Sequence, residues 1–157
     1  MSMIEKSVRG ERNNNPLNVR WDGRTEWRGQ DPIRRSDRSL KTDGTHGFVV
    51  FVEPVWGLRA AARTLWNYQN KHGLDTVAKI VGRWAPPNEN ETKSYVKRVA
   101  KEMGVSPVEP VDLRDRKLMI DLLRAMIRVE CGRVIYSDDA IRAGVEIAGI
   151  PVLPAAR

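Results

Sequence analysis

One carboxylate lies where a reactive side chain would be useful, at the inner end of an apolar helix. Residues 113–132, LRDRKLMIDLLRAMIRVECG, place apolar side chains three and four positions apart, which is the stripe of a core-facing helix. Glu130 is the next position on that stripe, and Gly132 follows as the expected C-terminal cap. Burial and the negative end of the helix dipole both disfavour a charged carboxyl group there. A carboxyl group that holds its proton can act as a general acid, so Glu130 is the first catalytic candidate.

A purely structural explanation of Glu130 stays open at this level. The side chain could swing to solvent at a frayed helix end, or pair with one of the many Arg residues, since ion pairs perturb carboxylates too. Other catalytic patterns are missing from the sequence: there is no Gly-x-Ser-x-Gly, no phosphate-binding loop and no His-Glu-x-x-His. Cys131 has no evident His partner, and His46 and His72 lack the spacing of metal ligands. We therefore expect neither a metal nor a cofactor.

The composition is that of one globular domain with a basic surface. The chain has 157 residues, 41% of them hydrophobic and 30% charged, and no apolar run approaches a membrane span of about 20 residues. No secretory signal is evident at the N-terminus. The net charge of +7 suggests a polyanionic partner, either nucleic acid or an anionic cell envelope, although a solvated basic surface explains it as well. Much of the excess lies in Arg9, Arg12, Arg20, Arg24, Arg28, Arg34, Arg35, Arg38 and Lys41.

The pattern along the chain predicts a mainly α (α+β) domain over residues 1–157, with loose tails at 1–8 and 150–157. Residues 48–52, FVVFV, are the clearest strand candidate and favour one small antiparallel sheet. Apolar periodicity, Pro, Gly and capping residues predict the helices. These are 55–72, 75–85, a helix from Asn88 or Asn90 to Met103, 113–132 with Asp112 as its cap, and 137–147 with Ser137 as its cap.

Two stretches have the composition of a carbohydrate site. Trp84 precedes the polar segment 88–92, and aromatic rings beside amides and carboxylates suit sugar faces and hydroxyl groups. The Asn-rich loop before Pro16 is structured by its side chains and could also supply sugar-binding amides. The alternative for Trp84 is a structural one, in which the ring fills the junction between two helices.

Several motifs together resemble a family of small phage proteins found as virion-associated or lytic proteins. The resemblance covers residues 9–148 and rests on RGERNNNPLNVRW, WRG, FVVFVEPVWGLRAAARTL, RWAPPNENETKSYV and IRVECGRVIYSDDAI. Members typically open with Arg-Asn-Asn-Asn-Pro-Gly-Asn-Ile-Arg, and Leu17 stands here in place of the Gly.

That family in turn resembles the lysozyme superfamily. The block from Asn14 to residue 51 is similar to the segment after the active-site helix of flagellar-type glucosaminidases. Residues 91–99, ETKSYVKRV, look like the Glu-Thr-x-x-Tyr-Val-x-x-Val motif of lytic transglycosylases, in which the Tyr touches the catalytic Glu; Tyr95 inherits that role.

The order of these blocks departs from the superfamily. In those enzymes a catalytic Glu-Ser-Gly precedes the other blocks, whereas here only Glu11 precedes Asn13, in a segment without a helical stripe. Glu130-Cys131-Gly132 looks like the missing motif moved to the C-terminal side. The resemblance therefore implies a circularly permuted lysozyme-like domain, a rearrangement that compact domains tolerate.

The resemblance implies a peptidoglycan-cleaving enzyme that cuts between N-acetylmuramic acid and N-acetylglucosamine. Glu130 would be the acid and Tyr95 its neighbour. No partner carboxylate stands out among Glu91, Asp138 and Asp139, which favours a lytic transglycosylase over a muramidase. The expected sugar-binding residues are Asn15, Asn18, Trp84, Asn90, Glu91 and Thr92.

Two alternatives accompany this hypothesis: a non-catalytic virion protein that binds peptidoglycan or other virion proteins, and a DNA-associated protein, although no nucleic-acid motif is evident. The expected location is the virion, or the host cytoplasm before release onto the periplasmic peptidoglycan.

Overall fold

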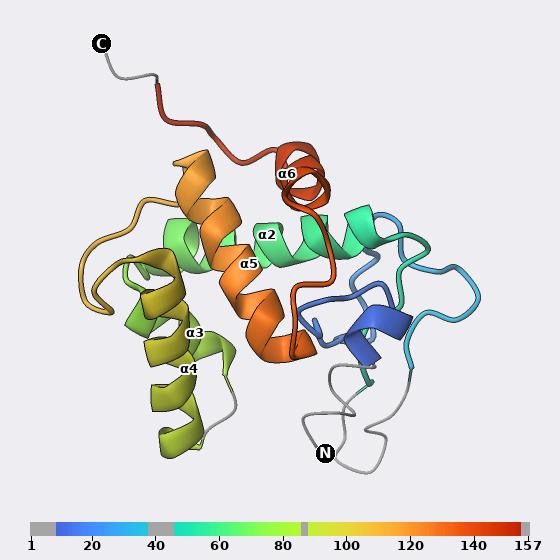
Figure 1. The fold of residues 1–157 in the computed structure, drawn as a ribbon. Helices are drawn as coiled ribbons and strands as arrows, with labels where there is room; N and C mark the ends of the chain where they lie inside the picture. Colours follow the sequence, from blue (N-terminus) through green and yellow to red (C-terminus); the bar gives the residue numbers. More distant parts are fainter. Residues whose placement is uncertain (1–8, 38–45, 86–87, 155–157) are drawn as a thin grey trace.

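The structure, a computed structural model, describes residues 9–37, 46–85 and 88–154, without the side chains of residues 89 and 90. A short helix at residues 9–12 precedes five longer helices in this part of the chain (Figure 1). The longer helices are α2 (Pro54–His72), α3 (Val77–Trp84), α4 (Glu89–Met103), α5 (Arg116–Cys131) and α6 (Asp138–Ile147). The prediction of a mainly α domain is therefore confirmed.

The predicted small sheet is wrong, because the described residues contain no β-strand. Residues 48–51 make three isolated antiparallel bridges instead, Arg20↔Phe48, Ser36↔Val49 and Gln30↔Phe51. A ladder cannot continue because the Asn-rich loop takes the backbone groups that a neighbouring strand would need. The Asn15 amide donates to the Val49 carbonyl, and the Asn14 amide donates to the Phe51 carbonyl. Arg38 and Lys41 lie outside the described residues.

Side-chain caps define where most of the helices begin. Thr76, Asn88 and Ser137 each accept a hydrogen bond from a backbone N–H in the first turn of α3, α4 and α6. The expected cap of α5 was wrong: Asp115, rather than Asp112, accepts from the first turn, and α5 begins at Arg116. Asp112 instead forms an ion pair with Arg114, at 2.7 Å.

Most of the core lies between α2, α5 and their neighbours. In Figure 1, α2 runs across the molecule and α5 crosses it, while α3 and α4 lie on one side and the irregular segments 9–37 and 46–51 lie on the other. The largest helix contacts join α2 to α6 and α4 to α5. Gly144 permits the close approach of α6 to α2, since a Cβ there would lie 2.4 Å from the Leu58 Cβ.

A second, smaller apolar cluster lies under these irregular segments. It contains Val19, Val49, Phe51 and Ala60, with Trp rings packed against it. The C-terminal tail is anchored further than expected, because Ile150 is buried and its carbonyl accepts from the Arg116 guanidinium. None of the described helices combines the length and apolar character needed to cross a bilayer.

Candidate functional site

Glu130 lies in the last turn of α5 and is enclosed by two other parts of the chain. Its side chain is 4% exposed. The Tyr95 hydroxyl donates to Glu130 Oε1 at 3.3 Å, and the Asn18 amide donates to Glu130 Oε2 at 3.3 Å. The predicted contact of Tyr95 with Glu130 is therefore present, and Asn18 of the Asn-rich loop joins it. The residue is almost fully buried, so little of the carboxyl group faces solvent.

Tyr95 comes from the second turn of α4 and presents its hydroxyl inward. Burial raises the pKa of Tyr95 well above 10, and the negative charge of Glu130 and its hydrogen bond raise the pKa further. The positive charge of Arg98, one turn along α4, opposes this rise. Tyr95 consequently stays a phenol across the physiological pH range and remains a hydrogen-bond donor toward Glu130.

Asn18 comes from a loop that its neighbouring Asn side chains build. Asn14 and Asn18 both have φ of 52°, a left-handed conformation that Asn tolerates better than most residues. The Asn15 amide donates to the carbonyls of Val19 and Val49, and Asn15 Oδ1 accepts from the Val19 N–H. Asn15 is therefore a buried structural residue whose amide is occupied. Asn18 is the member of the loop that reaches the carboxyl group.

Cys131 fastens the same loop to the end of α5. Its thiol donates to the Pro16 carbonyl at 3.3 Å. Burial, with smaller contributions from the negative charges of Glu130 and Glu11, raises the pKa of Cys131 to about 12. The thiol is therefore un-ionised at neutral pH, and an un-ionised thiol is a poor nucleophile.

The other predicted site residues lie in varied surroundings. Trp84 is partly buried, packs against both apolar clusters and meets Tyr68 edge-on, with ring centroids 6.1 Å apart. Glu91 is exposed at the start of α4, where its N–H is capped by Asn88. Thr92 is half-buried in the next position of that helix. The side chain of Asn90 lies outside the described residues.

The two candidate partner carboxylates lie at the start of α6. Asp138 pairs with Arg124 at 2.8 Å, and Asp139 is exposed. An ion-paired carboxylate is a poorer general base than an unpaired one, since its positive neighbour stabilises the charged form. The ion pair with Arg124 therefore disfavours Asp138 as a partner of Glu130.

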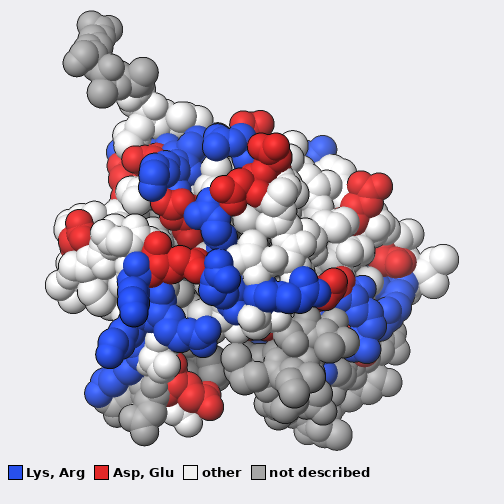
Figure 2. Space-filling model, viewed as in Figure 1, with Lys and Arg blue, Asp and Glu red and all other residues white. Residues whose placement is uncertain are grey.

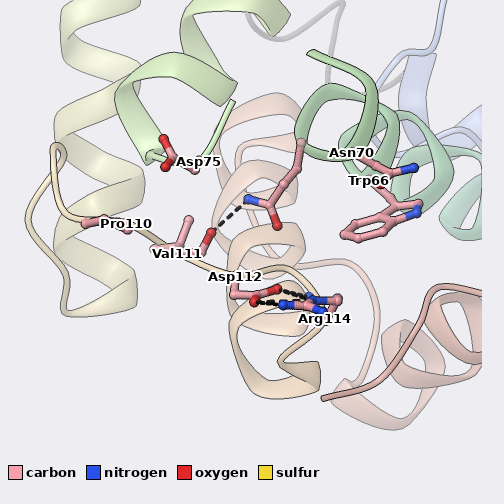
Figure 3. A pocket seen from close by; sticks show the side chains of 8 residues that line it. Trp66, Asn70, Asp75, Pro110, Val111, Asp112 and Arg114 are labelled. Carbon is pink, nitrogen blue, oxygen red and sulfur yellow. Dashed lines mark hydrogen bonds and ion pairs between the residues drawn. The ribbon is translucent and has the colours of Figure 1, made fainter. Parts of the chain in front are cut away.

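A pocket of about 390 Å³ lies near the opposite end of α5, where Trp66 and Asn70 of α2 face residues 110–114 (Figure 3). Most of the polar groups that line this pocket are already occupied. Gln69 donates to the Val111 carbonyl, and its oxygen accepts from the Leu113 N–H. The charged lining residues are likewise paired, Asp112 with Arg114 and Asp75 with Lys79. The hydrogen bonds of Gln69 join α2 to the connection before α5. Because its polar groups are already paired with one another, the pocket offers few of them to a ligand, and we do not assign it as the functional site.

Comparison with known proteins gives one informative similarity. No protein-family model matches the chain. The chain is 37% identical over 151 residues to Protein P5 of Pseudoalteromonas phage PM2, and the match covers 92% of this chain and 84% of that protein. The similar region therefore includes the Asn-rich loop, α4 and α5, which together form the Glu130 site.

Proposed function

This chain belongs to the family of Protein P5 of Pseudoalteromonas phage PM2, and from that premise we propose that it is a phage protein that cleaves the glycan strands of peptidoglycan. One observation carries the proposal: a buried Glu130 whose two carboxyl oxygens accept from Tyr95 and Asn18. These hydrogen bonds hold one carboxyl group in a defined orientation in a protected place, which general acid catalysis requires. The resemblance of residues 91–99 to the transglycosylase motif supports the same assignment for Tyr95.

In the proposed reaction, Glu130 gives its proton to the glycosidic oxygen between N-acetylmuramic acid and N-acetylglucosamine. The bond from the muramyl C1 to that oxygen breaks, and N-acetylglucosamine leaves with the proton. Glu130, now a carboxylate, takes the proton of the muramyl 6-hydroxyl as its oxygen bonds to C1, which yields a 1,6-anhydro sugar. Tyr95 and Asn18 orient the carboxyl group in both steps.

The surroundings of the other carboxylates favour this single-Glu route over hydrolysis. Hydrolytic glycosidases normally use two carboxyl groups about 5–10 Å apart. Asp138 is ion-paired and Glu91 is exposed at a helix start, so neither has the surroundings of a second catalytic group. Because Glu130 is 4% exposed, the reaction further requires that glycan binding open a path to it.

The same burial favours a second candidate function. A buried carboxyl group that links α5 to α4 and to the Asn-rich loop could serve only to hold these segments together. The protein would then be a non-catalytic phage component that binds peptidoglycan or another phage protein. It would retain purified sacculi on pull-down and release no muropeptides.

The finer structural proposal is a circularly permuted lysozyme-like domain. It is supported by the block order, with Glu130-Cys131-Gly132 after the Tyr95 motif, and by the hydrogen bond between Tyr95 and Glu130. In this proposal the catalytic helix has moved from the start of the domain to its C-terminal half.

A lysis assay on purified sacculi tests the proposed function with two matched variants. Glu130→Gln keeps the size of the side chain but removes its proton, so the rate should fall by at least about a hundredfold. Glu146→Gln removes an exposed carboxylate of α6 and should lyse like wild type. Mass spectrometry of the products should show 1,6-anhydro ends. Undiminished lysis by Glu130→Gln, in a variant with native circular dichroism, would exclude Glu130 as the acid, and sacculus binding without lysis by wild type would favour the non-catalytic function.

A further inference from the structure

A groove between α4 and α5 is lined by positively charged side chains. It has a volume of about 370 Å³ and is lined by Arg98, Lys101, Glu102, Ala125, Arg128 and Val129. Figure 2 shows Lys and Arg side chains gathered over α4 and continuing over α5. We call this feature the basic groove.

The charge of the basic groove is only partly neutralised. Arg128 forms an ion pair with Glu102 across it. Within the described residues, neither Arg98 nor Lys101 has an ion-pair partner. Three cations therefore share one carboxylate, and two of them are available to an anionic ligand.

The inner wall of the basic groove is apolar. Ala125 and Val129 lie one turn apart on α5 and contribute their methyl groups to it. Ala125 is 2% and Val129 8% exposed, so the apolar wall is narrow, and a short aliphatic branch of an anionic ligand covers it where a bare phosphate would not.

The basic groove adjoins the Glu130 site through both helices. Arg98 follows Tyr95 by one turn of α4, and its charge acts on the Tyr95 hydroxyl. Val129 directly precedes Glu130 in α5. The groove therefore lies close in the fold to the Tyr95 hydroxyl, which donates to Glu130.

We propose that the basic groove binds the anionic peptide stem of peptidoglycan, so that the protein selects peptide-substituted glycan. This inference rests on the proposed function. The stem is attached through the lactyl group at C3 of the same muramic acid whose C1 bond would be cut. It is a short chain of small aliphatic and carboxylate-bearing residues, which matches the methyl groups and unpaired cations of the groove.

A nucleic acid is a weaker match to the basic groove. Protein contacts with DNA are dominated by phosphates spread along a surface, and their number sets the affinity. The groove is bounded, has an apolar wall and keeps one of its three cations paired with Glu102. These features favour a short ligand segment over a phosphate backbone.

Calorimetric titration with the synthetic tetrapeptide L-Ala-γ-D-Glu-meso-diaminopimelate-D-Ala tests the assignment. The double variant Arg98→Gln/Lys101→Gln should raise the Kd about fivefold, since each exposed charge pair contributes about 0.5 kcal/mol. The matched control Lys71→Gln/Arg142→Gln removes two exposed charges from α2 and α6 and should keep the wild-type Kd. Absence of peptide binding by wild type, or equal weakening in both double variants, would overturn the proposal.

Two further arms separate this inference from its alternatives. A 20-base-pair DNA duplex that binds more tightly than the peptide, and loses affinity only in Arg98→Gln/Lys101→Gln, would overturn it in favour of a polyphosphate ligand. Peptide binding requires no bond cleavage. If the protein binds the tetrapeptide through Arg98 and Lys101 but does not lyse sacculi, the proposed enzymatic activity is wrong and the proposed peptide binding by the basic groove is retained. Conversely, equal lysis of sacculi and of amidase-treated, peptide-free glycan would contradict peptide recognition by the basic groove and would leave the proposed glycan cleavage intact.

Discussion

At the scale of single residues, Asn18 and Tyr95 approach one carboxyl group from distant parts of the chain. Asn18 lies 112 residues before Glu130 and Tyr95 lies 35 residues before it. Each donates to a different carboxyl oxygen, so neither can replace the other. A substitution at Tyr95 therefore removes the hydrogen bond to Oε1 and leaves the hydrogen bond from Asn18 to Oε2 in place.

Replacing Tyr95 with Phe removes one donor and keeps the buried ring. The free energy of unfolding should fall by about 1–2 kcal/mol, because a buried hydrogen bond to Glu130 is lost. If Tyr95 orients the acid, lysis should fall by about tenfold at saturating substrate. The control Tyr68→Phe alters a half-buried hydroxyl on α2, and its lysis rate should stay at the wild-type value. Equal lysis by Tyr95→Phe and wild type would remove Tyr95 from the proposed mechanism.

Burial of Cys131 should make the free energy of unfolding fall as the pH rises above 9. Its pKa is 9.0 ordinarily and about 12 in the fold, so between these values the unfolded chain releases a proton that the folded protein retains. Unfolding is therefore favoured as pH rises, and the stabilising contribution, complete below pH 9, is lost progressively toward pH 12. Urea unfolding from pH 8 to 10.5 should show a smaller loss of stability in Cys131→Ser than in wild type. Parallel pH profiles would contradict this assignment, since the tyrosines titrate in both proteins.

At the scale of elements, the Asn-rich loop is held between α2 and the end of α5. Its carbonyl at Asn14 lies against Gly57 in the first turn of α2, and its carbonyl at Pro16 accepts from Cys131. The loop therefore places Asn18 at Glu130 only while both helices keep their positions. The same loop also prevents residues 48–51 from forming a strand.

Gly57→Ala tests this packing. A Cβ at residue 57 would lie 1.9 Å from the Asn14 carbonyl oxygen, so the loop must shift. We expect the free energy of unfolding to fall by about 1–3 kcal/mol, as for other overpacked positions. The matched control is Gly82→Ala in α3, where a Cβ would meet nothing within 4 Å and the helix should gain up to about 1 kcal/mol. Equal thermal stability of the two variants would refute the close loop contact.

At the scale of the whole molecule, the positions of the two chain ends bear on the proposed circular permutation. The described chain begins and ends on opposite sides of the molecule in Figure 1. A simple circular permutation opens one surface loop, so the new N- and C-termini would lie close together. A permutation alone therefore does not explain the separated ends, and the proposal also requires that the terminal segments follow a different path along the surface than in the unpermuted domain.

A chain with the order reversed tests whether the fold depends on the present arrangement. It would run from 109 to 157, through a Gly/Ser linker of about 20 residues, and then from 1 to 108. The cut lies in the exposed turn at residues 106–109, where Val108 is 75% exposed. We expect native helical circular dichroism and retained sacculus lysis, since Glu130 still meets Tyr95 and Asn18. The Glu130→Gln form of the same chain is the control, and failure of the reordered chain to fold would contradict the proposal.

The amino-acid sequence by itself determined most of the helices and the inward position of Glu130, because periodicity and caps depend on neighbouring residues. Ser137 caps α6 as expected, and Asn88 is the one of the two expected residues that caps α4. The start of α5 was misplaced because Asp112 and Asp115 are equally good local caps. The motif resemblance predicted Tyr95 beside Glu130, whereas only the tertiary structure showed that Asn18 donates to its second oxygen.

The tertiary structure also removed the expected strand and formed the basic groove. Residues 48–51 have strand-forming side chains, but the Asn15 amide, 34 residues away, occupies the Val49 carbonyl. The groove likewise combines Arg98 of α4 with Val129 of α5, which no local pattern connects. Both outcomes depend on contacts between distant segments, whose geometry arises only when the helices pack.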